Sequence, residues 1–217
     1  MKKLTLLLLA AAITMGLCAS KPAPDAPADA TPESIRLFNG RDLEGWGAVL
    51  QDKSLDPARE FTVRDGVIHL SGKFGYIYPK TVYSDYRLEV EWRWAGEASN
   101  SGIFVHVTPD DRWLPECFEC QLKAGSAGSI YGFNGPLSAE MRAADNNNIQ
   151  RREPNNERPV GEWNRAEIVC DGDRITITIN GEQQVVATGV TPSRGYIGLQ
   201  SEGEAVEFRN VVLTPLR

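Results

Sequence analysis

The chain has 217 residues, a formal net charge of −6 and 41% hydrophobic residues. This length supports one domain with a single core once an N-terminal leader is subtracted. The acidic balance, without a basic cluster, argues against nucleic acid as a partner, because phosphate binding needs a high density of Lys and Arg.

The first residues have the pattern of a secretory signal peptide, which we place at residues 1–19. Lys2 and Lys3 form a short basic start, and residues 4–13 form an unbroken run of Leu, Ala, Thr and Ile. Such a run is too short to span a bilayer core of about 30 Å as a helix, and it matches the apolar region of a signal peptide. We therefore expect an exported protein, located in the periplasm or anchored at the outer membrane.

Two processing routes fit the end of this leader. Cleavage after Ala19 would release the protein, whereas lipidation of Cys18 would tether it to a membrane as a lipoprotein. Leu17, just before the cysteine, argues against lipidation. The flexible linker rich in Pro and Ala at residues 20–34 argues for it, because that composition cannot bury a core and suits a tether. We slightly favour the lipoprotein, with residues 35–217 as the folded domain.

Alternating apolar and polar residues dominate this domain. A period of two is typical of half-buried strands, and it predicts strands at 87–94, 101–107, 117–122, 166–170, 174–179, 183–187, 196–201 and 206–213. Asn180-Gly181 is a strong signal for a two-residue hairpin turn. Many short strands separated by Gly-containing turns predict an all-β fold, a β-sandwich of two antiparallel sheets.

Two features interrupt or accompany the strand pattern. Residues 136–159 look irregular, with one helical turn expected at 138–144, and a loop of that length is either functional or a solvated excursion. Cys117 and Cys120 lie three apart in a predicted strand, too distant to form a disulfide. We expect Cys120 and Cys170 to be small core residues.

The polar sides of the strands carry reactive side chains. In 101–107, Ile103, Val105 and Val107 are the expected core residues, which leaves His106 on the opposite face. If the strands share one sheet, its open face has the composition of a polar binding groove. A solvated polar face is also routine for an antiparallel sheet. The residues concerned are Glu89, Glu91, Arg93, His106, Glu119, Gln121, Tyr196, Gln200 and Glu202, with Trp113, Tyr131 and Tyr76 as a rim for a sugar ring.

Eight segments occur in the order typical of one family. They are 37–46 (LFNGRDLEGW), 65–68 (DGVI), 86–93 (YRLEVEWR), 100–104 (NSGIF), 119–121 (ECQ), 131–132 (YG), 161–164 (GEWN) and 198–210, which contains GLQ and FRN. They span essentially the whole domain, which therefore resembles the 3-keto-disaccharide hydrolase family. The resemblance implies a concanavalin-like jelly roll. The chain departs from the family's pattern at His106, where many members carry Arg, and near Ser201, where many carry His, which puts the family's substrate in doubt here.

The resemblance implies cleavage of a glycoside or oligosaccharide that carries a ketone at C3. The ketone acidifies the C2 proton, so a base removes it, the C1 substituent leaves, and water adds later. We assign Glu119 or His106 as the base, Arg93 or a bound divalent cation as the group that polarises the ketone, and Glu91 as the acid or a metal ligand. Glu91, His106 and Glu119 would suit a divalent cation. Predicted substrate contacts come from Gln121, Asn100, Trp113, Tyr131 and Gln200.

Other functions stay open, among them a purely structural surface protein. A direct glycosidase needs two carboxylates about 5–9.5 Å apart, but Glu116 and Glu119 are three apart and point to opposite faces of a regular strand. A non-catalytic carbohydrate-binding module is the stronger rival, because fold does not decide function. Such a module would bind sugar without turnover and would have little use for His106, Arg93 and Glu119 together.

Overall fold

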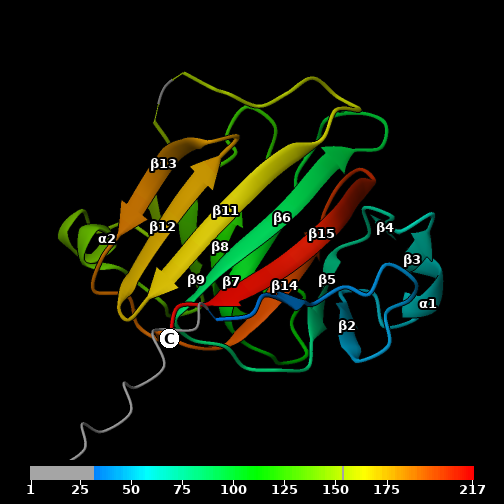
Figure 1. Ribbon diagram of the computed structural model, residues 1–217, viewed down its shortest axis with the longest axis horizontal. Helices are drawn as coiled ribbons and strands as arrows, with labels where there is room; N and C mark the ends of the chain where they lie inside the picture. The colour runs from blue at the N-terminus through cyan, green and yellow to red at the C-terminus, as the bar shows by residue number, and fades with distance from the viewer. Residues whose placement is uncertain (1–31, 153) are drawn as a thin grey trace, which may run out of the picture. The chain divides into compact units, whose positions relative to one another are not determined.

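A computed structural model describes residues 32–152 and 154–217. Cys18 and the expected signal peptide lie outside these residues, as does most of the expected linker. In the described part, the strands form two antiparallel sheets that lie one in front of the other in Figure 1. The predicted all-β jelly-roll sandwich of two antiparallel sheets is therefore confirmed.

Sheet A is the front layer of Figure 1 and has eight strands within the described residues. Its spatial order is β13 (Glu182–Ala187), β12 (Arg174–Ile179), β11 (Asn164–Asp171), β6 (Tyr86–Trp94), β15 (Val206–Pro215), β4 (Val67–Leu70) and β3 (Phe61–Arg64), with β1 (Ile35–Arg36) on β15.

Sheet B lies behind it and has seven strands in the same part of the chain. Its order is β10 (Asn148–Ile149), β9 (Ile130–Phe133), β8 (Glu116–Gln121), β7 (Gly102–Thr108), β14 (Tyr196–Ser201), β5 (Gly75–Pro79) and β2 (Trp46–Leu50). Two short helices, α1 (Pro57–Glu60) and α2 (Ala139–Ala143), complete the described elements.

The core lies between the two sheets and follows from the alternation in the sequence. Every second residue of β6 is buried, and Trp92 has no exposed surface. Phe208 of β15 and Phe118 of β8 are also fully buried in this core. Each such side chain contributes about 1.5–3 kcal/mol of hydrophobic stabilisation. The core also contains Cys120 and Cys170, as predicted, and neither forms a disulfide.

The hairpin turn and the helical turn predicted from the sequence are both present in the structure. Asn180 and Gly181 both have positive φ, 49° and 87°, in the turn between β12 and β13, which is the geometry of a type I′ hairpin turn. The predicted helical turn is α2, and the hydroxyl of Ser138 accepts a hydrogen bond from the Met141 backbone amide at 3.2 Å. This is an N-cap, which satisfies a free amide of the first turn.

A β-bulge in β7 changes the orientation of its last residues. The register between β7 and β8 shifts between Val105 and Thr108, and His106 has a φ of 53°. The extra residue exchanges the faces that follow it. Val107 therefore joins a cluster on the outer side of sheet B, and His106 turns its ring against Phe118 of the core. Ile103 and Val105 lie in the core as predicted, whereas the orientations predicted for His106 and Val107 are wrong.

Within residues 32–152 and 154–217, no helix has both the length and the apolar character needed to cross a membrane.

Candidate active site on the outer face of sheet B

The polar residues that we expected on one face are divided between two sheets. Glu91 and Arg93 lie on β6 in sheet A, whereas Glu119 and Gln121 lie on β8 in sheet B. The prediction of a single shared face is therefore wrong. Alternation tells which residues of a strand leave the core, but both sheets of a sandwich have an outer side.

On sheet A, Arg93 is held by structural partners. Its Nε atom donates to Glu207 Oε2 at 2.6 Å, and the other oxygen of Glu207 lies 2.9 Å from His69 Nδ1. The Arg93 guanidinium also lies over the ring of Trp163, 4.6 Å from its centroid. Arg93 therefore pairs with Glu207 and Trp163 on sheet A, whereas Glu119 lies on sheet B. Because the two side chains are on different sheets, Arg93 cannot polarise a ketone bound beside Glu119.

Glu91 lies in a similar arrangement. Its Oε2 atom accepts from Arg209 Nε at 2.6 Å, and the Arg209 guanidinium lies 4.0 Å from the centroid of Trp163. Two guanidiniums thus lie over one half-buried indole, a cation–π arrangement that attracts both charges to the ring. Glu91 belongs to this ion-pair network of sheet A and does not reach the outer face of sheet B.

On sheet B, the polar residues come together across neighbouring strands. Tyr76 of β5 pairs with Gln200 of β14, and Gln121 of β8 pairs with Gly102 of β7. Glu119 pairs with Tyr131 of β9. Residues that face one another across strands lie about 5 Å apart, so an acid, two amides and two phenols occupy one continuous region.

Glu119 is the central acid of this region. Its side chain is 2% exposed, and the partner of its carboxyl is an amide, Gln121 Nε2, at 3.3 Å. Burial raises the pKa of Glu119 well above the ordinary carboxyl value, and the negative charge of Glu202 raises it further. A carboxyl that is buried without a cation and coupled to a second acid is typical of sites that move protons.

Gly102 provides the space in which the Glu119 carboxyl lies. A Cβ atom at this position would come within 2.2 Å of Glu119 Oε1. Glycine in the interior of a strand is unfavourable unless another group must approach closely. Gly102 was not predicted as a site residue, although a glycine inside a strand pattern is the signal that could have identified it.

Two acceptors around Glu119 lack partners among the described residues. These are Gln200 Oε1 and Asn100 Oδ1, both buried. The Gln200 amide nitrogen donates to Glu202 Oε2 at 2.9 Å. The backbones of Glu202 and Asn100 lie next to each other as an isolated antiparallel β-bridge. An unsatisfied buried polar atom costs about 1–3 kcal/mol. A ligand rich in hydroxyl groups would remove this cost.

The predicted metal ligands do not meet. Glu91 is on the outer side of sheet A, His106 packs into the core and Glu119 is on the outer side of sheet B. Nowhere in the described residues do three or more His, Cys, Asp or Glu side chains gather in a way that could hold an ion. The ligand set that we predicted is therefore not assembled in this fold.

His106 does not face Glu119 either. Its Nδ1 atom lies 2.9 Å from the carbonyl oxygen of Pro192, and its ring packs edge-on against Phe118. Burial lowers the pKa of His106 to about 4, so the imidazole is neutral near neutral pH. The structure gives His106 a place in the core and not in the proton-transfer site.

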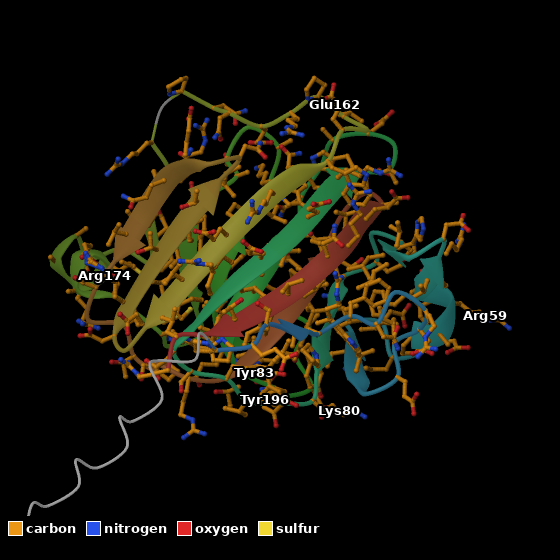
Figure 2. The ribbon with its side chains drawn as sticks, in the orientation of Figure 1. Arg59, Lys80, Tyr83, Glu162, Arg174 and Tyr196 are labelled. Atoms are coloured by element: carbon orange, nitrogen blue, oxygen red, sulfur yellow. The ribbon has the colours of Figure 1, made fainter. Side chains whose placement is uncertain are left out.

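The other half of the outer face of sheet B is apolar. Tyr76, Phe104, Val107 and Cys117 are fully buried there. The loop at residues 109–115, here called the strap, packs Leu114 against this cluster. Aromatic rings that include Tyr196, labelled at the lower edge of Figure 2, also pack against it. Tyr76 therefore lies under the strap and not on an exposed rim.

The remaining predicted rim residues are accessible. Tyr131 is half-buried, stacks on Phe133 with centroids 5.9 Å apart, and its hydroxyl lies 3.3 Å from Gln150 Nε2. Trp113, also half-buried, is in the strap and packs edge-on against Phe74 at 4.9 Å. The sequence pattern did not single out Phe74, which is 42% exposed.

Comparisons with known proteins agree with this fold. A Bacteroides thetaiotaomicron protein named 3-keto-disaccharide hydrolase is 24% identical over 82% of this chain and 76% of its own length. A solved Parabacteroides distasonis structure, provisionally named as a glycosyl hydrolase, is 21% identical with a TM-score of 0.67, over 85% of this chain and all of its own. The Bacillus subtilis carbohydrate-binding module CBM66 is 14% identical with a TM-score of 0.58, over 78% and 95% of the two chains.

The family model of the 3-keto-alpha-glucoside-1,2-lyase-like domain matches residues 33–214, which include both sheets and the strap. The chain belongs to this family.

Proposed function

We propose that this protein cleaves the glycosidic bond of 3-keto-glycosides on the outer face of sheet B, with Glu119 as the general base. The observation that carries the proposal is the buried Glu119 carboxyl among amide groups, with unpartnered acceptors beside it. The family name and the name of the Bacteroides relative support a carbohydrate-active enzyme.

In the proposed reaction, the Glu119 carboxylate takes the proton from C2 of the sugar. The electrons of the C2–H bond form the enolate of the C3 ketone. When the enolate collapses, a C1–C2 double bond forms, the bond between C1 and its oxygen substituent breaks, and the substituent leaves as an alcohol after protonation. Water then adds across the C1–C2 double bond and restores the 3-keto sugar. No oxidant or reductant is needed, because elimination followed by hydration amounts to hydrolysis.

The surrounding residues suit this chemistry. In this proposal, Gln200 Oε1 and Asn100 Oδ1, which lack partners among the described residues, accept hydrogen bonds from sugar hydroxyls. The amide nitrogen of Gln121 is a donor beside Glu119, and it takes the place that we first assigned to Arg93 next to the developing enolate. A raised pKa makes the ionised carboxylate a stronger base, which favours removal of a weakly acidic carbon-bound proton.

The test is turnover of a panel of 3-keto disaccharides and their unoxidised parents by the purified domain, followed by release of the leaving sugar. We expect cleavage of the keto forms alone, and a loss of about 10²–10⁴-fold in Glu119→Gln. Cleavage of the unoxidised parents would instead indicate direct hydrolysis by Glu119 and Glu202. Sugar binding without any turnover would indicate a binding module, as in the structural neighbour CBM66.

We also propose that the protein works outside the cytoplasm, anchored through a lipid on Cys18. The support is the sequence of the leader and of the linker that follows it. Expression of the full chain with Cys18→Ser should move the protein from the membrane fraction to the soluble fraction. An unchanged distribution, or a mature protein that begins at Ser20, would refute the lipid anchor.

A further inference from the structure

The strap crosses the outer face of sheet B from one end to the other. It follows Thr108 and precedes Glu116, the end of β7 and the start of β8. Its middle nevertheless contacts the opposite end of the sheet. Lys53 Nζ donates to the Asp111 carbonyl oxygen at 2.8 Å, and Trp113 packs against Phe74, the residue just before β5. The strap therefore brings an indole into contact with Phe74, which lies at the end of the sheet where β7 begins and β8 ends.

Two hollows flank the Phe74–Trp113 pair. One has a volume of about 270 Å³ and includes Gln51, Arg112 and Asn134 in its lining. The other has about 190 Å³ and includes Gln51, Lys73 and Phe74. Each is smaller than the roughly 300–1,000 Å³ of a complete small-molecule site. They are suited to hold one part of a ligand whose reacting part lies elsewhere.

The chemistry of this surface fits a sugar. Phe74 and Trp113 offer apolar ring surface, and exposed aromatic surface of this kind marks binding sites. Gln51 lies between the two hollows, and charged side chains surround them. A pyranose ring has an apolar C–H face and a polar edge of hydroxyl groups, so it can pack on the rings while it hydrogen-bonds to the rim.

The pair also lies at a useful distance from Glu119. Phe74 and Tyr76 are two residues apart and therefore on the same side of the sheet, and Tyr76 pairs with Gln200. The Glu119 carboxyl leans over Gly102, two strands from β5. Strand spacing and rise then separate it from Phe74 by about 12 Å. One sugar ring cannot contact both places.

We propose that Phe74, Trp113 and Gln51 bind the leaving sugar of the glycoside, while the keto sugar lies at Glu119. This inference rests on the proposed function. The site at Glu119 is buried, so the part of the substrate that leaves must extend toward the accessible surface, where the aromatic pair is placed. The pair then favours disaccharides and longer glycosides over glycosides with a small leaving group.

The test compares a 3-keto disaccharide with the methyl 3-keto-glycoside of the same keto sugar, in wild type, Phe74→Ala and Trp113→Ala. Both variants should lose about tenfold more kcat/KM on the disaccharide than on the methyl glycoside, mainly through KM. Val160→Ala, which removes another exposed hydrophobic side chain outside the site, should show no such difference. Equal losses on both substrates would refute the subsite.

A binding measurement separates this inference from the proposed reaction. Glu119→Gln is titrated with the unoxidised disaccharide by NMR, with and without Phe74→Ala. Weaker binding in the double variant supports the subsite even if no 3-keto substrate is turned over, in which case only the proposed reaction fails. Binding that does not depend on Phe74 overturns the subsite even if the wild type is active.

Discussion

Replacing Glu119 with glutamine should stabilise the protein, and more so as the pH rises. Because burial raises the pKa of Glu119, the folded chain holds this proton more tightly than the unfolded chain does. Between the ordinary carboxyl pKa of about 4.3 and the raised value, the wild type therefore loses about 1.4 kcal/mol of stability per pH unit. The variant has no proton to lose there, so its relative stability grows by the same amount.

Thermal unfolding from pH 4.5 to pH 8 measures this difference. In a domain of about 185 residues, 1 kcal/mol corresponds to a Tm change of about 2–4 °C. The Tm of Glu119→Gln should therefore gain about 3–6 °C on the wild type per pH unit, until the raised pKa is passed. Glu162→Gln is the control, because Glu162 is exposed and lies at the upper edge of Figure 2.

A Tm difference between Glu119→Gln and wild type that stays constant with pH would refute the argument from burial. Turnover provides a second, independent result. The same substitution should lower kcat by about 10²–10⁴-fold if Glu119 is the base. Full turnover with the expected pH-dependent gain in Tm would leave the burial argument intact and remove Glu119 from the mechanism.

Three further substitutions address neighbouring features. Burial lowers the pKa of His106 to about 4, so between pH 6.5 and pH 4 only the unfolded chain takes up this proton, and the wild type should lose about 3 kcal/mol of stability. His106→Asn should abolish that loss in thermal melts. Gly102→Ala should displace the Glu119 carboxyl and lower kcat/KM by about 10–100-fold with an unchanged circular dichroism spectrum; normal kinetics would contradict the close approach. Arg93→Gln should cost about 1–3 kcal/mol in denaturant unfolding, because Glu207 loses a partner, and a large loss of turnover would return Arg93 to the site.

The strands were predictable because the alternation of apolar and polar residues within each strand reflects which of its side chains are buried. β6 spans 86–94 where alternation indicates 87–94, and β8 spans 116–121 where it indicates 117–122. The hairpin at Asn180-Gly181 was predictable for a similar reason, since only certain residues adopt two consecutive positive φ angles readily. These are local properties of the chain.

The site was only partly predictable, because its assembly depends on non-local pairing. Glu119, Gln121 and Gln200 were identified correctly as neighbours on one face. Glu91 has the same alternation as Glu119, and no local signal assigns the two acids to different sheets. The orientation predicted for His106 was wrong because one extra residue in β7 exchanges the faces of the strand. Val105 and Val107 are both apolar, so the sequence around His106 does not indicate the bulge.

The separation of charge between the two sheets has a consequence for engineering this protein. The ion pairs of sheet A, including those of Glu91 and Arg93, lie on the opposite side of the core from Glu119. Directed evolution can therefore diversify the two outer faces as separate libraries, one selected for heat resistance and one for new sugars. Substitutions from the two libraries should combine additively, since sites with no shared partners rarely couple.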